Sequence, residues 1–140
     1  MASGYSGTPL FKKLGIKDGY RMMIIDQPKN YFQLLANLPN VEIVNDVTSK
    51  KDFIHFFVKD ENTFIKKLNV FKDQLKQNGM IWISWPKRSS QIKSDVTEDT
   101  IRKFAIKCGL VDVKVCAIDD IWSGLKFVIP LKERKSSKDQ

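Results

Sequence analysis

Stretches of strand length alternate with stretches of helical periodicity along most of this chain, and this alternation limits the fold more than any other feature. The predicted strands are Tyr20–Asp26, Val41–Val47, Phe53–Val58, Met80–Trp85, Val111–Ile118 and Leu125–Leu131. The predicted helices run from the N-cap Thr8 to Gly15, and then over Pro28–Leu38, Asp60–Asn78 and Thr97–Cys108. Strands that alternate with helices build a mostly parallel sheet with helices on both faces. The sequence therefore predicts a three-layer α/β fold with a sheet of about six strands.

The last elements add an antiparallel pair to this sheet. The connection Asp119–Gly124 is too short for the crossover that parallel neighbours need, so we expect an antiparallel C-terminal hairpin. Its acids Asp119 and Asp120 are interpreted as turn-capping residues rather than cation ligands. Phe53–Val58 lacks apolar–polar alternation, which indicates a central strand buried on both faces. Its His55, the single histidine of the chain, is expected to be buried and hydrogen-bonded rather than catalytic.

The length of 140 residues suits one domain with a sizeable core. We assign residues 1–131 to a single α/β domain, in which residues 1–15 form an N-terminal arm and a short helix. Residues 132–140 carry four basic and two acidic side chains and are predicted to be a disordered basic tail.

Composition narrows the function classes. Cys108 and Cys116 are too few for a disulfide framework or a cysteine-based zinc site, so no metal site is expected. No apolar stretch has the length of a membrane span, and we predict a cytoplasmic protein without a membrane partner. The net charge of +8 fits an anionic ligand or a nucleic acid, but solvated lysines on helix surfaces are the preferred explanation. The partner therefore stays open.

The order of elements from Gly15 onward resembles the S-adenosylmethionine-dependent methyltransferase fold, which is Rossmann-like. In that fold the first strand is central and the last-numbered strand inserts antiparallel beside the fifth. Relative to it, one strand–helix unit is missing here between the second and third predicted strands. The resemblance implies a ligand edge at the carboxyl ends of the parallel strands.

A closer resemblance is to a family of small bacterial domains of unknown function. Three segments carry it, in the same order: GYSGTPL…KLGIK at Gly4–Lys17, SWPK at Ser84–Lys87, and VDVKVCAIDDIWSGLKFV at Val111–Val128. This resemblance implies no activity.

The turn after the first predicted strand departs from the methyltransferase pattern. Methyltransferases use a glycine-rich turn there to admit the methionine moiety, and an acidic residue after the second strand holds the ribose. Gln27–Asn30 contains no glycine. Asp46 could be the acidic residue that follows the second strand. We therefore expect that S-adenosylmethionine is not bound and that the chain uses no cofactor.

Of the strand ends at the predicted ligand edge, the loop Ser84–Ser90 (SWPKRSS) offers the most groups that can bind a ligand: an indole, two cations and three hydroxyls. Its candidate ligand-binding residues are Ser84, Trp85, Lys87, Arg88 and Ser89. The two cations could hold a phosphate or a carboxylate while the indole stacks on a ring. The alternative is that Trp85 closes the core and the cations are solvated.

The N-terminal segment Gly4–Thr8 supplies a second set of candidates, Tyr5, Ser6 and Thr8. It could fold over the sheet edge or hold an anion at the start of the following helix. An ordinary ordered arm is the alternative.

These features favour a non-catalytic binding or interaction module on a degenerate methyltransferase-like fold, with no catalytic residues assigned. The alternative is a binder of an anionic small molecule or nucleic acid through the Ser84–Ser90 loop. An uncharacterised enzyme is the third interpretation.

Overall fold

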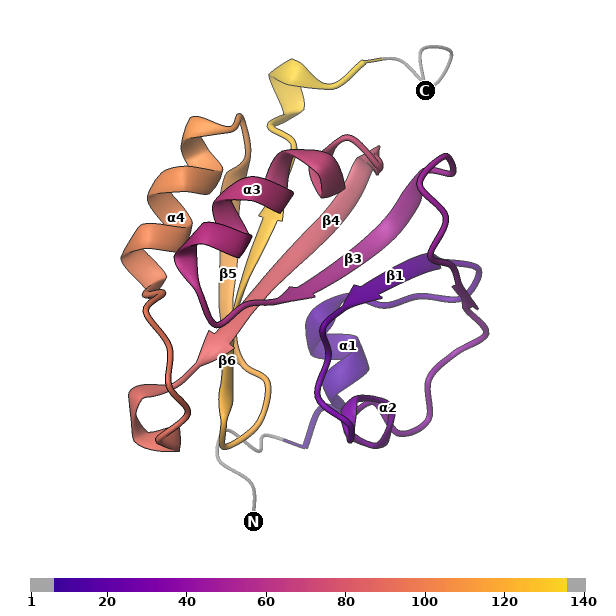
Figure 1. Cartoon of the computed structure of the whole chain (residues 1–140). Coiled ribbons are helices and arrows are strands. Elements are labelled where there is room, and N and C mark those ends of the chain that lie inside the picture. The colour runs from indigo at the N-terminus through magenta and orange to yellow at the C-terminus, as the bar shows by residue number, and fades with distance from the viewer. Residues whose placement is uncertain (1–6, 136–140) are drawn as a thin grey trace.

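The computed structural model describes residues 7–135, which form one six-stranded sheet with helices on both sides (Figure 1). The strands are β1 (Arg21–Ile25), β2 (Glu42–Ile43), β3 (Lys51–Phe57), β4 (Leu75–Pro86), β5 (Val111–Ala117) and β6 (Trp122–Val128). The helices are α1 (Leu10–Leu14), α2 (Tyr31–Leu34), α3 (Glu61–Lys72) and α4 (Glu98–Lys107), with 3₁₀ turns at Arg88–Ser90 and Leu131–Glu133.

The sheet order is β2-β1-β3-β4-β6-β5. β1 runs parallel to both β2 and β3, and β3 runs parallel to β4. β6 is antiparallel to β4 on one side and to β5 on the other. The predicted mostly parallel sheet with an antiparallel C-terminal hairpin is therefore confirmed.

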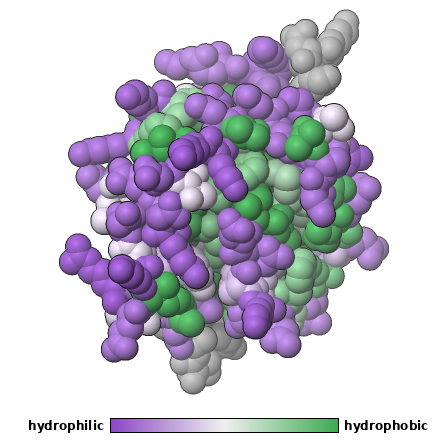
Figure 2. Space-filling view, in the orientation of Figure 1, coloured by the Kyte–Doolittle hydropathy of each residue, from purple (hydrophilic) through white to green (hydrophobic). Residues whose placement is uncertain are grey.

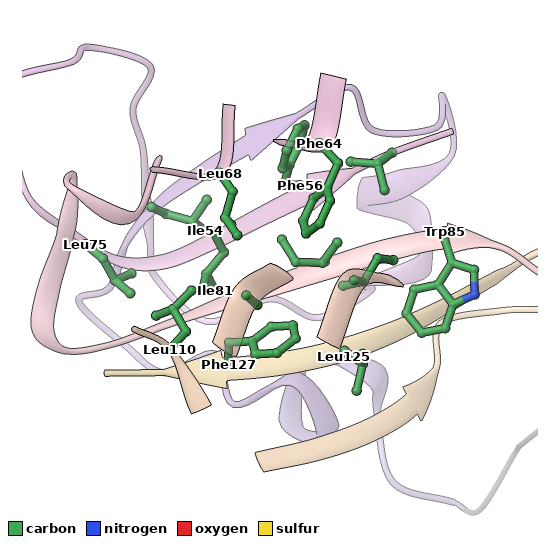
Figure 3. Close-up of a cluster of buried hydrophobic side chains, with 14 of the residues drawn as sticks. Ile54, Phe56, Phe64, Leu68, Leu75, Ile81, Trp85, Leu110, Leu125 and Phe127 are labelled. Carbon is green, nitrogen blue, oxygen red and sulfur yellow. The ribbon is translucent and has the colours of Figure 1, made fainter. Parts of the chain in front are cut away.

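Helices α3 and α4 bury one face of the sheet. In Figure 3, Phe64 and Leu68 of α3 point toward Ile54, Phe56 and Ile81 of the central strands, and all five side chains are fully buried. The apolar face of α3 therefore packs on the middle of the sheet, where burial of each such side chain contributes about 1.5–3 kcal/mol.

Helices α1 and α2 bury the opposite face around Trp82 of β4. The Trp82 side chain is fully buried, and its indole Nε1 donates a hydrogen bond to the backbone oxygen of Leu14 at 2.9 Å. Tyr31 of α2 is 1% exposed and meets Phe57 of β3 edge to face, with 5.5 Å between the ring centres. Two cores, one on each face of the sheet, confirm the three-layer arrangement and the burial of β3 on both faces.

The helices cover the sheet unevenly. In Figure 1, α3 and α4 lie in front of the β4–β6–β5 side, whereas no helix lies in front of β1. Figure 2, in the same orientation, shows apolar surface in the right half of the view, on the side where β1 and β3 lie. On this side β2 ends the sheet. In chain order β3 follows β2 directly, at the point where the methyltransferase resemblance predicted a missing strand–helix unit.

The predicted helix Asp60–Asn78 is too long. α3 ends at Lys72, and β4 begins at Leu75, five residues before the predicted strand start. The fully buried Lys51 holds the chain out of the helix at Gln74. Its backbone N–H donates to the Gln74 carbonyl oxygen at 2.8 Å, and its Nζ donates to Gln74 Oε1 at 2.7 Å. Gly79 does not end the helix. It lies inside β4, where a Cβ would stand 2.9 Å from the Lys51 carbonyl oxygen, so the two backbones can approach only at glycine.

Three other predicted boundaries are also wrong. Helix Pro28–Leu38 shrinks to Tyr31–Leu34, strand Val41–Val47 shrinks to Glu42–Ile43, and strand Leu125–Leu131 lies at Trp122–Val128. Asn37, with φ 67°, takes a left-handed conformation that a helix cannot continue. Asp46 closes a local turn by accepting hydrogen bonds from Thr48 and Ser49, which draws the chain out of the extended conformation.

The two long helices α3 and α4 have side-chain caps. Asp60 accepts a hydrogen bond from the Thr63 N–H at 2.9 Å, and Thr97 accepts one from the Thr100 N–H at 3.2 Å. At α1 the predicted cap is wrong, because Pro9 occupies the N-cap position in place of Thr8 and no side chain caps the helix.

The chain end beyond β6 is ordered for a few residues. Within the predicted tail, the Arg134 side chain donates to the Ile129 carbonyl oxygen at 2.9 Å, and the Lys135 N–H donates to Gln77 Oε1 at 2.9 Å. Residues 136–140 lie outside the described part. Among the helices of residues 7–135, none combines the length and apolar character needed to cross a bilayer.

Candidate functional site

The carboxyl ends of β1, β3 and β4 meet at one edge of the sheet. Ile25 of β1 is in register with Phe56 of β3, and Phe57 is in register with Ser84 of β4. The Val58 N–H continues this ladder by donating to the Ser84 carbonyl oxygen at 2.8 Å. The strand neighbours expected from the sequence are therefore present, and ligands of open α/β sheets bind beyond this edge.

The turn after β1 keeps a left-handed residue although it has no glycine. Asp26 has φ 59°, a conformation that glycine adopts freely and aspartate tolerates. Pro28 follows and has no N–H to offer. The Tyr31 N–H donates back to the Pro28 carbonyl oxygen at 3.1 Å, and the Tyr31 side chain is buried in the core. The turn is thus anchored by its own first helical residue.

Asp46, which the sequence places where a ribose contact would stand, is engaged in its own loop. Its Oδ2 accepts the Ser49 N–H at 2.7 Å and the Thr48 hydroxyl at 3.0 Å, while its Oδ1 accepts the Ser49 hydroxyl at 2.8 Å. The side-chain and backbone hydrogen bonds from Ser49 hold the Asp46 pKa well below its usual range. Both carboxylate oxygens are therefore already used in closing the turn.

A cavity of about 290 Å³ opens beside the end of β4, and it is the edge pocket of this site. Its lining residues come from the β4 end and from the start of α4: Trp85, Pro86, Arg88, Val96, Thr97, Glu98 and Asp99. Figure 3 shows Trp85 at the end of the buried cluster, with its indole nitrogen on the side away from the cluster. The ring is 7% exposed, so one surface of it belongs to the core and one edge faces the edge pocket.

The acidic side chains around the edge pocket have ion-pair partners, whereas its arginine has none among residues 7–135. Glu98 accepts a hydrogen bond from Arg102 at 2.7 Å, and the Asp99 carboxylate lies 3.2 Å from Lys103 Nζ. Arg88 is exposed and forms no ion pair with any residue between 7 and 135. A planar guanidinium with unused donors next to an indole N–H can bind a carboxylate or a phosphate.

The other candidate residues from the sequence are not all brought to this pocket. Ser84 is fully buried on the opposite face of the sheet from Trp85, because consecutive residues of a strand point to opposite faces. Lys87 is half-buried and Ser89 is exposed, and neither lines the edge pocket. Thr8 is exposed beside α1. Tyr5 and Ser6 lie outside the described residues.

Ser84 instead ends a buried polar chain through the only histidine. The Tyr31 hydroxyl lies 2.9 Å from His55 Nδ1, and His55 Nε2 lies 2.7 Å from Ser84 Oγ. Since a neutral imidazole has one donor and one acceptor nitrogen, one hydroxyl donates to the ring and the other accepts from it. Burial lowers the pKa of His55 to about 3, so the ring is neutral at ordinary pH.

The predicted role of His55 as a buried, hydrogen-bonded residue is confirmed, while its two partners were not predicted. A serine hydroxyl beside a histidine is an arrangement used in nucleophilic catalysis. Here both side chains have no exposed surface, so no substrate reaches them. The hydrogen-bonded series Tyr31–His55–Ser84 is therefore structural.

The C-terminal hairpin turn also matches its interpretation. Asp119 Oδ1 accepts hydrogen bonds from the N–H groups of Ile121 and Trp122, each at 2.8 Å, which is the expected side-chain cap of a turn. Between residues 7 and 135, no group of three histidine, cysteine or acidic side chains is placed to hold a metal ion.

Comparison with solved structures identifies the fold. An S-adenosylmethionine-dependent methyltransferase from Aquifex aeolicus aligns over 86% of this chain and 88% of its own, with a TM-score of 0.56 and 15% identity. The DhpI–SAH complex aligns over 88% and 83%, with a TM-score of 0.62 and 10% identity. An O-methyltransferase family 2 protein from Planctomyces limnophilus gives a TM-score of 0.58 at 8% identity, and the chain spans half of its length.

At these identities the likeness establishes a methyltransferase-like fold and nothing about activity. No model of a known protein family matches the sequence, and neither does any curated protein. The resemblance to small bacterial domains of unknown function therefore stays a prediction.

Proposed function

We propose that this chain is a non-catalytic binding module on a methyltransferase-like fold, with its ligand in the edge pocket beside Trp85 and Arg88. The observation that carries the proposal is the turn after β1. A cofactor turn needs small residues so that consecutive backbone N–H groups can approach the ligand. In this chain the turn carries Gln27, Pro28 and Lys29 in place of glycines, and Pro28 removes one donor.

S-adenosylmethionine titrated into the protein should give no heat of binding up to millimolar concentration. The physical reason is the loss of the backbone contact at Gln27–Asn30, together with the use of both Asp46 oxygens inside their own turn. The methyltransferase from Aquifex aeolicus, titrated under the same conditions, is the matched positive control. Micromolar binding by this chain would overturn the proposal.

A second candidate function is binding of a small anion in the edge pocket, and the unpaired guanidinium of Arg88 favours it. The ligand class would combine an anionic group for Arg88 with a flat ring for the exposed edge of Trp85. The carboxylates of Glu98 and Asp99 do not cancel Arg88, because each already has its own cation on α4.

Adenosine monophosphate is a suitable probe for this second function. We expect its addition to shift the Trp85 indole N–H resonance, and Arg88→Ala to weaken that binding by about tenfold, the usual loss for one charged hydrogen bond. Lys67→Ala, at an exposed position of α3, is the control that lowers the net charge equally without touching the edge pocket. Equal affinities of the two variants would argue against the role of Arg88.

A further inference from the structure

Lysines from three separate segments converge on the sheet face that α1 covers, which is the face opposite the edge pocket. Lys114 of β5 and Lys126 of β6 are directly paired across the hairpin, so their side chains leave the same face of the sheet. Lys114 Nζ donates to the Lys13 carbonyl oxygen of α1 at 3.0 Å. Lys17 follows α1 and acts electrostatically on Lys126. We call Lys17, Lys114 and Lys126 the lysine cluster.

The end of α1 lies directly over Lys126 but accepts nothing from it. Gly15 caps the helix with φ 88°, and a Cβ added there would stand 3.6 Å from Lys126 Nζ. A helix end exposes carbonyl oxygens that usually attract such a cation. Here the last four carbonyls have other donors.

Each of those donors is visible in the structure. The carbonyl oxygens of Phe11 and Lys12 accept the Ile16 and Gly15 N–H groups, at 3.0 and 3.1 Å. That of Lys13 accepts Lys114 Nζ, and that of Leu14 accepts the Trp82 indole N–H. Within residues 7–135 Lys126 therefore has neither a hydrogen-bond acceptor nor an ion-pair partner.

No carboxylate among residues 7–135 forms an ion pair with a lysine of this cluster. Asp112 of β5 points to the other face of the sheet, where it pairs with Arg102 at 3.1 Å. Asp18 accepts the Asn40 N–H at 2.9 Å. Partial burial lowers the pKa of Lys126, and the charges of Lys114 and Lys17 lower it further. Like charges held together at a half-buried position are unfavourable until an anion joins them.

A hollow of about 320 Å³ adjoins the lysine cluster through Gly15 and Lys17. Its other walls come from the apolar residues Phe11, Ile16 and Pro39 and from the charged residues Lys12 and Asp18. An anion held by the lysine cluster would therefore have an apolar space beside it for a ring or an acyl group.

We propose that the lysine cluster and this hollow bind a small phosphorylated molecule with an apolar body. A phosphate group carries up to two negative charges and several acceptor oxygens, so it can bind three ammonium groups that form no ion pair within the described part of the chain. The site is independent of the edge pocket, from which it is separated by the sheet.

Phenyl phosphate is the probe for this site, because it joins the required charge to an apolar ring. At low ionic strength we expect calorimetric binding that is stronger than that of inorganic phosphate. Lys126→Met keeps the aliphatic stem and should weaken binding at least about tenfold, as expected for loss of a charged contact. Without ligand, the same variant should melt no lower than the original protein, since it removes a half-buried charge that has no partner.

The control variant is Lys107→Met, at an exposed position near the end of α4, which changes the net charge equally. It should bind phenyl phosphate as the original protein does. Equal binding by Lys126→Met, or absence of phenyl phosphate binding at millimolar concentration, would overturn the proposal. Binding of single-stranded RNA with a steep salt dependence and no response to phenyl phosphate would also overturn it, because that pattern belongs to an extended polyanion surface.

Discussion

Replacing Trp82 by alanine should lower the free energy of unfolding by about 3–5 kcal/mol, the usual range for removing a large buried aromatic side chain. Trp82 is fully buried at the centre of β4 and also holds α1 through its hydrogen bond to the Leu14 carbonyl oxygen. Domains of this size have a total stability of about 5–15 kcal/mol, so the variant should lie near the limit of folding. Equilibrium urea unfolding followed by far-UV circular dichroism measures the loss.

Two further variants keep this prediction testable if the alanine variant does not fold. Trp82→Phe retains a ring but removes the N–H donor and part of the volume, and we expect a loss of about 1–3 kcal/mol. Val113→Ala, at a half-exposed position of the edge strand β5, should change stability by less than about 0.5 kcal/mol. A Trp82→Ala loss no larger than that of Val113→Ala would contradict the anchoring of α1 by Trp82.

The strand order was predictable because it follows from local signals. Phe53–Val58 is apolar at almost every position, which only a strand buried on both faces can accommodate. The short Asp119–Gly124 connection left an antiparallel hairpin as the only geometry for the last pair. Chain length and the periodicity of each segment then determined the layers.

The end of α3 could not be predicted, because a contact distant in sequence decides it. Leu75 continues the helical spacing of Leu68 and Phe71, so periodicity alone assigns it to the helix. In the structure Leu75 is paired with Lys51 of β3, whose side chain binds Gln74 from 23 positions away. A buried lysine that needs an acceptor outweighs the local pattern.

The candidate site was predicted only in part. The sequence could have shown that Ser84 and Trp85 do not belong to the same site. Ser84 and Trp85 are consecutive residues of a strand and therefore face opposite sides of the sheet. Period-two alternation would have assigned Trp85 to the face of α4 and Ser84 to the face of α1, beside His55. The pairing of Lys114 with Lys126 and the effect of Lys17 on Lys126 could come only from the structure, because the last strand begins at Trp122 and not at the predicted Leu125.

Stability should fall as the pH decreases from about 6.5 to 5, and His55 should be the cause. The folded-state pKa of His55 is lowered to about 3 by burial, whereas in the unfolded chain it is about 6.5. Above pH 6.5 both states are neutral, and this residue adds no pH dependence. Below it, the unfolded state binds a proton that the folded state does not. The free energy of unfolding therefore decreases by up to about 1.4 kcal/mol per pH unit.

The carboxylates do not interfere in this window. Asp46 and Asp60 have lowered pKa values in the folded protein because of hydrogen bonds from Ser49 and Thr63. Their contribution is present above the unfolded pKa of about 3.9 and is lost only as the pH falls below it. Between pH 6.5 and 5 the histidine is thus the main titrating side chain, and the chain has only one.

His55→Gln separates this effect from all others, because glutamine can offer one donor and one acceptor to Tyr31 and Ser84 but does not titrate. Urea unfolding of both proteins at a series of pH values measures the difference. We expect the original protein to lose about 2 kcal/mol between pH 6.5 and 5, as the linkage relation gives, and the variant to lose little. A parallel loss in the two proteins would mean that the imidazole gains its proton in the folded state, and that burial does not keep it neutral.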